Sequence, residues 1–398
     1  MDEVSENMSS QFRMECGNHT DEDLELISSF NYWLEGVLMI IVGIFGLVGN
    51  SVSILVLASR EMRNSFNYFL IVLSTTDNLF IFITLLDYSF TRVFSWPIDF
   101  DSEVYAIFFP RVFYPLNNIS MTLSIFLVMV ITHERYIAVC HPHAYRQNEA
   151  EGGGTRVLIC TCIVLIPAII INIPKFFETE LTFEDSVDNE GLFNNYTVSY
   201  DVTDLRKNPN YIRFYVNWCL LVFTGIIPLA FLLFFNYKIF QGIRYTHARC
   251  RKSRSGEINL AAILVCIVVV FVVCNLLRVV LNVFELFWLD NIFRCGDEFM
   301  HAAWFHCLNS ISHLLLVLNS SSNFLIYCSL GTNFKLVLRK VFNRICRVKE
   351  RTNLETKQND MDMDILGVAE QTVQNINAIS AVSAVSAVHS NGIIETSL

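Results

Sequence analysis

A glutamate and an arginine, Glu134 and Arg135, stand next to each other near the end of a long apolar run. After Tyr136 the run returns to Ile-Ala-Val. A charged side chain in a membrane costs roughly 3 kcal/mol or more, so each one is a candidate for function. Such a pair can hold one arrangement of helices and be exchanged for other contacts in a second arrangement. The alternative is an interfacial pair that only anchors its helix.

A second group of polar residues lies inside the apolar runs, in LSTTDNLFIFI, GLVGN and LLLVLNSSSNFLIY, and at Ser124, ten residues before Glu134. One carboxylate with several hydroxyl and amide oxygens could hold a small cation such as Na⁺, because hard cations prefer oxygen ligands. The same residues could instead form a hydrogen-bond network that ties helices together. The sequence leaves both readings open. The group consists of Asn50, Asp77, Ser124, Asn319, Asn323 and Tyr327.

Other kinds of chemistry have no support in the sequence. No nucleophile stands with a general base in a recognisable constellation, and the twelve cysteines show no spacing typical of a metal site. Most of these cysteines fall inside apolar runs, where cysteine is a small core residue. We therefore expect no enzyme activity, no metal centre, no cofactor beyond the possible Na⁺, and no nucleic-acid partner.

The elements that carry these residues are predicted to be membrane helices. The chain is 53% hydrophobic and 17% charged, whereas a soluble domain has about 25% charged residues. The apolar residues collect in seven runs that are long enough to cross a bilayer as helices. The expected fold is all-α, a seven-transmembrane helix bundle followed by a short amphipathic helix on the membrane surface at 333–346. The predicted spans are 33–59, 66–93, 105–139, 156–176, 212–245, 256–289 and 301–328.

Charge sets the expected orientation. Lysine and arginine gather after spans one, five and seven, and this places those loops and the C-terminus in the cytoplasm. The opposite face is acidic and carries the glycosylation sequons at Asn7, Asn18 and Asn195. The expected organisation is an extracellular N-tail at 1–32, a membrane domain at 33–346 and a disordered cytoplasmic tail at 347–398, where the composition is polar.

The order of short motifs along the spans resembles a rhodopsin-class G-protein-coupled receptor over roughly residues 33–346. The resemblance implies a plasma-membrane receptor with a heterotrimeric G protein and arrestin as partners. It also implies that Glu134 and the basic loops hold Arg135 at rest, and that Arg135 meets the G protein when spans five and six move apart. The matching motifs are Gly49-Asn50, Leu73 with Asp77, Glu134-Arg135-Tyr136, Pro228, and Asn323 with Tyr327, where Phe324 replaces the usual proline.

Longer segments resemble the invertebrate FMRFamide-type neuropeptide receptors, which implies an amidated neuropeptide as the ligand. These segments are VFYPL at 112–116, NIPKFFE at 172–178, EINLAAILVCIVVVF at 257–271, LNVFE at 281–285 and LNSSSNFLIY at 318–327.

The chain also departs from the receptor pattern. Pro110 stands where relatives have a cysteine at the top of span three, and the second outer loop has no cysteine, so the usual disulfide cannot form. Cys16 and Cys295 are the candidate replacement, because the outside is oxidising; the alternatives are free cysteines or a Cys295–Cys307 bond. Span six lacks the Cys-Trp-x-Pro motif and has Leu277 or Arg278 in place of the proline.

Two ligand classes are disfavoured and a third is favoured. Asn117 replaces the span-three aspartate of amine receptors, and span seven has no lysine for retinal. A cationic peptide suits the acidic outer face. An Arg-Phe-amide end needs an acid for its guanidinium and aromatic surroundings for its ring. The alternatives are a receptor for another class of peptide and a membrane transporter, which would need several buried titratable groups and internal repeats. The candidate peptide-binding residues are Asp87, Asn117, Glu178, Glu285, Trp304 and His313.

The end of the chain carries two candidate attachment sites. Cys346 closes the amphipathic stretch and could carry a palmitoyl chain at the lipid surface. Thr396 and the terminal Leu398 resemble a ligand of PDZ domains, which add such ends to a sheet edge.

Overall fold

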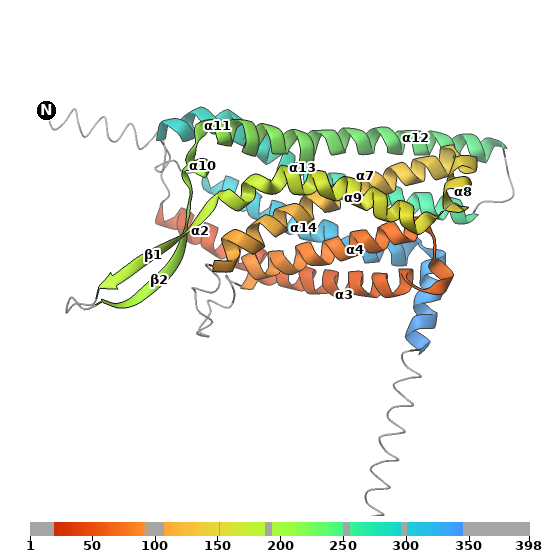
Figure 1. Cartoon of the computed structure of the whole chain (residues 1–398), viewed down its shortest axis with the longest axis horizontal. Helices are drawn as coiled ribbons and strands as arrows, with labels where there is room; N and C mark the ends of the chain where they lie inside the picture. The colour runs from red at the N-terminus through yellow and green to blue at the C-terminus, as the bar shows by residue number, and fades with distance from the viewer. Residues whose placement is uncertain are drawn as a thin grey trace, which may run out of the picture. The chain divides into compact units, whose positions relative to one another are not determined.

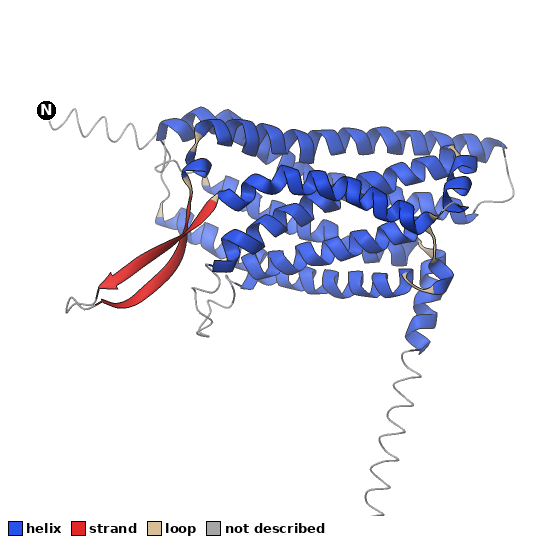
Figure 2. Ribbon diagram, viewed as in Figure 1, coloured by secondary structure: helices blue, strands red, loops and turns tan. Residues whose placement is uncertain are grey.

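The computed structural model describes residues 20–90, 93, 107–150, 152–187, 193–249, 255–295 and 301–344. Within these residues, seven helical segments are long and apolar enough to cross a membrane, which confirms the predicted spans. Residues up to Val337 form one compact unit in which these helices run side by side (Figures 1 and 2). The segments are Asp21–Leu57, Ser65–Ser89, Phe109–Cys140, Gly153–Phe177, Pro209–Gly242, Val265–Leu289 and Ala303–Leu330.

Most spans combine a long α-helix with a shorter helical turn at the outer end. The α-helices are α3 (Met39–Leu57), α4 (Ser65–Thr84), α7 (Tyr114–Cys140), α9 (Gly153–Asn172), α12 (Ile227–Arg249), α13 (Ser255–Cys295) and α14 (Ala303–Leu330). The outer turns are η1 (Tyr32–Leu38), η3 (Leu85–Phe90), η4 (Phe109–Phe113), η5 (Ile173–Phe177), η6 (Ile212–Cys219) and η7 (Leu221–Ile226). Connecting pieces are η2 (Arg60–Met62), α8 (Pro142–Ala150), α10 (Asp204–Lys207) and α11 (Pro209–Tyr211), and residues 332–344 are also helical.

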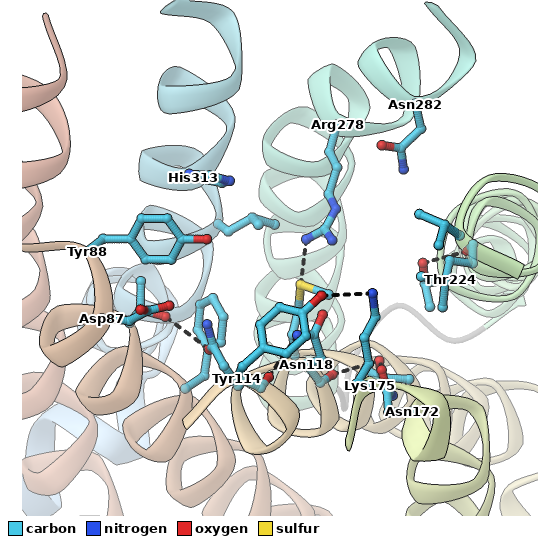
Figure 3. A pocket seen from close by; sticks show the side chains of 18 of the residues that line it. Asp87, Tyr88, Tyr114, Asn118, Asn172, Lys175, Thr224, Arg278, Asn282 and His313 are labelled. Carbon is cyan, nitrogen blue, oxygen red and sulfur yellow. Dashed lines mark hydrogen bonds between the residues drawn. The ribbon is translucent and has the colours of Figure 1, made fainter. Parts of the chain in front are cut away.

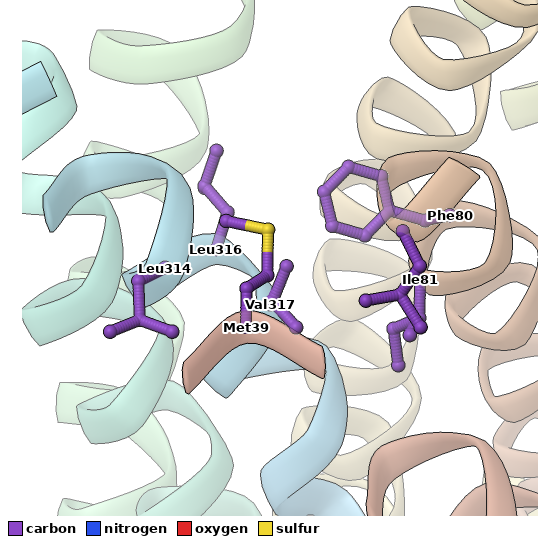
Figure 4. Packing of buried hydrophobic residues seen from close by; sticks show 7 residues of the cluster. Met39, Phe80, Ile81, Leu314, Leu316 and Val317 are labelled. Carbon is purple, nitrogen blue, oxygen red and sulfur yellow. The ribbon is translucent and has the colours of Figure 1, made fainter. Parts of the chain in front are cut away.

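Small residues let α3 and α14 approach closely. A Cβ added at Gly46 would collide with Ser321 Oγ, and one added at Gly49 would lie 2.9 Å from Phe324 Cβ. Such small residues at helix contacts are typical of membrane bundles, where close van der Waals packing drives association. Next to this contact, an apolar cluster joins α3, α4, η3 and α14 (Figure 4). The cluster consists of Met39, Phe80, Ile81, Leu85, Leu314, Leu316 and Val317.

The second outer loop contains a β-hairpin, an element that the all-α prediction did not include. Strand β1 (Thr179–Val187) pairs antiparallel with β2 (Phe193–Val202), in a register that runs from Thr179↔Val202 to Val187↔Phe193. Threonine, tyrosine, phenylalanine and valine recur among polar residues in the hairpin, and these are the residue types that favour strands. The acidic residues between them made the segment resemble a charged loop.

A second unpredicted element lies at the start of the first span segment. Helix α2 (Asp21–Asn31) starts within the segment that we assigned to the N-tail. Thr20 caps it: the Thr20 hydroxyl accepts from the Asp23 backbone N–H at 3.2 Å, and the Asp23 carboxylate accepts from the Thr20 N–H at 3.1 Å. This reciprocal arrangement is the capping box that begins many helices. The Thr-Asp-Glu-Asp signal was present in the sequence.

Candidate functional site

A cavity of about 230 Å³ lies within the bundle, between η3, α7, η5, α13 and α14 (Figure 3). Its wall is unusually rich in charge. Asp87 and Glu285 supply carboxylates, while Lys175, Arg278 and His313 supply basic groups. A cavity that gathers groups of both signs from four helical elements is suited to a ligand that carries both a cation and a hydrogen-bond acceptor.

Four of the six candidate peptide-binding residues line this cavity, namely Asp87, Asn117, Glu285 and His313. Glu178 and Trp304 do not. The Trp304 side chain is 47% exposed and makes an edge contact with Phe284, with ring centroids 5.9 Å apart. The sequence suggested Trp304 as a wall of the pocket, and in the structure it is not among the residues that line this cavity.

Glu178 is instead the centre of a buried hydrogen-bond cluster beside the cavity. Its carboxylate accepts from Tyr114 Oη at 2.5 Å, from Tyr211 Oη at 2.8 Å and from Lys175 Nζ at 3.0 Å. Burial by itself raises the pKa of this carboxyl, but the Lys175 charge and the hydrogen bonds outweigh burial and hold the pKa below its usual range. Glu178 therefore joins α7, η5 and α11 in the region where the usual disulfide is missing.

Two groups in the cavity wall were not among the sequence candidates. Lys175 reaches it from η5 and Arg278 from α13 (Figure 3). Each is a lone cation in a largely apolar stretch, Lys175 in NIPKFFE and Arg278 in VVCNLLRVVLN. A single cation in such surroundings could have been recognised in the sequence as a candidate site residue. Arg278 had been considered only as a replacement for a proline.

His313 is fixed in the wall by two neighbours. Its Nδ1 lies 2.9 Å from Glu35 Oε1, and its ring centroid is 4.7 Å from that of Tyr88. Ser89 Oγ donates to the Glu35 backbone oxygen at 2.6 Å. These contacts connect η1, η3 and α14 at the outer end of the bundle.

The polar group in the middle of the membrane is partly brought together around Asp77, which is 1% exposed. Ser124 Oγ donates to Asp77 Oδ1 and Asn323 Nδ2 donates to Asp77 Oδ2, both at 2.7 Å. Asn50 Nδ2 bonds to the backbone oxygen of Ser320 at 3.0 Å. In the described part of the chain, Asn319 has only a local contact, in which its backbone oxygen accepts from Ser322 Oγ at 2.8 Å, and the buried Tyr327 hydroxyl has no hydrogen-bond partner. One carboxylate and one hydroxyl are ligand types that suit a cation.

The Glu134-Arg135 pair lies near the C-terminal end of α7. Glu134 is 3% exposed, and its Oε1 lies 2.6 Å from Arg156 Nη2 of α9. The Arg135 guanidinium lies over the ring of Phe66, 2.9 Å from its centroid. Tyr136 packs edge-on against Phe235 of α12, with ring centroids 5.1 Å apart. The triplet thus contacts α4, α9 and α12, so a movement of any of these helices would change its contacts.

Several other candidates lie at or beyond the limits of the described residues. Cys295 is disulfide-bonded and Cys307 is a free thiol, which excludes a bond between these two. Asn195 lies in β2, opposite Ser186. Cys16, Asn7, Asn18, Cys346, Thr396 and Leu398 lie outside the described residues.

The family profile and the individual relatives that match this chain both point to seven-transmembrane receptors. Residues 49–327 match the sequence profile of the 7 transmembrane receptor (rhodopsin family). The chain is 32% identical over 318 residues to the FMRFamide receptor of Drosophila melanogaster, a match that covers 78% of this chain and 54% of that receptor. The chain therefore spans about half the length of this relative.

Two further relatives bind different peptides according to their names. An FMRFamide peptide receptor of Caenorhabditis elegans is 24% identical, over 77% of this chain and 69% of the relative. The allatostatin-A receptor of Bombyx mori is 25% identical, over 82% of this chain and 84% of the relative.

Proposed function

This chain belongs to the rhodopsin family of seven-transmembrane receptors, and from that premise we propose that it binds an amidated FMRFamide-like neuropeptide and signals to heterotrimeric G proteins. It is a multi-pass membrane receptor and not an enzyme. We further propose that it resides in the plasma membrane, with the acidic cavity end outside and the basic loops in the cytoplasm.

The single observation that carries the peptide proposal is the cavity. Its volume of about 230 Å³ is below the roughly 300–1,000 Å³ of pockets that bury a drug-sized ligand. It therefore suits the end of a peptide whose remainder lies on the outer face. Asp87 and Glu285 offer carboxylates to a guanidinium, and the aromatic ring of Tyr88 lies in the same wall. An Arg-Phe-amide end presents the complementary groups.

The proposal is tested with cells that express the full chain on their surface. Peptides ending in Arg-Phe-amide are expected to raise a calcium or cAMP response, whereas the same peptides with a free C-terminal acid should be weaker. Cells that carry empty vector are the control. An allatostatin-type peptide belongs in the same panel because one relative has that name. If only that peptide, or none, activates the receptor, the Arg-Phe-amide proposal is wrong.

We also propose that the Asp77 cluster is a sodium site that stabilises the resting receptor. Asp77 and Ser124 would be ligands, and Asn323 would orient the carboxylate. Because a ligand shifts a conformational equilibrium toward the state that it binds better, Na⁺ should weaken agonist binding. Replacing NaCl by N-methylglucamine chloride at constant ionic strength should strengthen agonist binding to the wild type, and Asp77→Asn should remove the difference. An Asp77→Asn receptor that keeps the full sodium effect leaves only the structural network.

The remaining proposals come from the sequence. Arrestin would bind the activated cytoplasmic face, and glycans would occupy Asn7, Asn18 and Asn195. Cys346 would carry a palmitoyl chain, which acyl-exchange labelling of Cys346→Ser can test. Thr396 and Leu398 would bind a PDZ-domain protein, and one added C-terminal alanine should then abolish its pull-down. Cys16 would be the partner of Cys295.

A further inference from the structure

Arg278 projects from the middle of α13 into the cavity (Figure 3). In the part of the chain that the structure describes, its one hydrogen bond is from Nη1 to Met121 Sδ, at 2.6 Å. A thioether sulfur is a weak acceptor, while a guanidinium has five N–H donors in a fixed planar fork. Arg278 therefore retains most of its hydrogen-bonding capacity in a site within the membrane.

The other two basic groups in the wall are already occupied. Lys175 Nζ contacts both Glu178 oxygens, at 3.0 and 3.2 Å, and His313 lies 2.9 Å from Glu35. No carboxylate of the described residues lies within ion-pair distance of Arg278. A charge in the membrane without an ionic partner is costly, and such a residue marks a functional site. A ligand that brings an acceptor to Arg278 would remove part of this cost.

Arg278 shares one face of α13 with Asn282 and Glu285. The spacings of four and three residues place side chains above one another on a helix, and all three line the cavity. Seven residues along a helix rise roughly 10 Å. Glu285 is two turns nearer the outer end at Cys295, so α13 presents an acid near the entrance and a guanidinium deeper inside.

We propose that Arg278 binds the C-terminal carboxamide oxygen of the peptide, while Glu285 binds the guanidinium of the preceding arginine. This inference rests on the proposed peptide function and assigns the direction of entry, with the C-terminus deepest. The lengths fit, because one residue spans about 3.5 Å and the arginine side chain reaches back toward the entrance. The carboxamide oxygen takes two N–H donors of the Arg278 fork, and Asn282 lies between the two charged groups.

The experiment compares two peptides on two receptors in competition binding with a labelled Arg-Phe-amide peptide. One peptide ends in Arg-Phe-amide, and in the other the terminal carboxamide is replaced by hydrogen, so that the end is a phenylethylamide. The wild type is expected to bind the second peptide about 10- to 100-fold more weakly, since a hydrogen bond to a charged group is lost. Arg278→Met removes the guanidinium and keeps an unbranched apolar side chain. It should bind both peptides with equal, weak affinity.

Arg111→Met is the matched control, because Arg111 is exposed on η4 and does not line the cavity; it should discriminate between the peptides as the wild type does. Equal binding of the two peptides by the wild type overturns the proposal, and so does undiminished discrimination by Arg278→Met. If Arg278→Met does not reach the surface, Arg278→Lys should retain a reduced discrimination, and full discrimination there counts against the bidentate contact. Failure of every Arg-Phe-amide peptide to bind the wild type would refute the proposed function itself, and the two failures are thus distinct.

Discussion

Replacing Arg135 by alanine is expected to abolish G-protein activation while peptide binding persists. Arg135 lies 7% exposed near the C-terminal end of α7, with its guanidinium over the Phe66 ring. The cavity is lined by the N-terminal part of the same helix, at Tyr114 and Asn117. A side chain near the C-terminal end of α7 can thus be removed without touching the cavity. The alanine variant loses the planar guanidinium that, by the family resemblance, contacts the G protein.

Two measurements on surface-expressed receptor separate these effects, namely labelled-peptide binding and agonist-stimulated nucleotide exchange on the G protein. Arg135→Ala should bind peptide within about threefold of the wild type and show no exchange above background. Arg135→Lys should recover only part of the exchange, because lysine keeps the charge and lacks the planar fork. Arg60→Ala is the control, since Arg60 is an exposed arginine in η2 and its loss should leave exchange intact. Normal exchange by Arg135→Ala would remove the triplet from the coupling machinery.

Neutralising the acids of the cavity is expected to cause the largest loss of peptide affinity. Glu285→Gln and Asp87→Asn each remove a carboxylate that faces the cavity and keep the size of the side chain. Loss of one partner of a desolvated charge pair costs about 2–5 kcal/mol, which corresponds to a loss of affinity of about 30- to 5,000-fold. At least one of the two variants should show a loss in this range with a peptide that ends in Arg-Phe-amide.

The peptide supplies the control for this prediction. A peptide with norleucine in place of the arginine should bind the wild type weakly, and the responsible acid variant should bind it no more weakly than the wild type does. Glu178→Gln serves as the contrast, because Glu178 is held by Tyr114, Tyr211 and Lys175. Its loss should reduce the amount and thermal stability of folded receptor and leave the affinity of the surviving receptor near that of the wild type. If Glu285→Gln and Asp87→Asn both bind the arginine peptide as the wild type does, the guanidinium is recognised elsewhere.

Hydropathy decided how well the fold could be predicted. The seven spans were found because about 20 consecutive apolar residues have one stable solution in lipid, a helix that satisfies its own backbone. The hairpin was missed because Glu180, Glu184 and Asp185 alternate with its strand-forming residues. Helix α2 was missed because its cap at Thr20 is a short local signal inside an acidic, polar segment. Both misses fall in segments rich in acidic residues, where composition constrains the backbone less than in the apolar runs.

Proximity in sequence decided how well the site could be predicted. The Glu134-Arg135-Tyr136 triplet is contiguous, and its features could be recognised from a few letters. The Glu178 cluster is formed by Tyr114, Lys175 and Tyr211, which come from three spans, and a single sequence does not indicate that such residues meet. Asp87 and Glu285 were found because an acid near the end of a span is conspicuous. Arg278 is just as conspicuous, as a lone cation in an apolar run. We missed it as a site residue because we considered it only as a replacement for proline.

The absence of proline from α13 has a mechanical consequence. The helix runs without interruption from Ser255 to Cys295, and an unbroken hydrogen-bonded helix bends little because sharp kinks need proline, glycine or an inserted group. Arg278 lies 23 residues from the first residue, a lever arm of roughly 35 Å. If the helix pivots near Arg278, a tilt of about 5° displaces its N-terminal end at Ser255 by roughly 3 Å over that arm. In a straight, stiff helix this displacement is proportional to the rotation near Arg278. In a kinked helix, a change of the kink angle would add to the displacement.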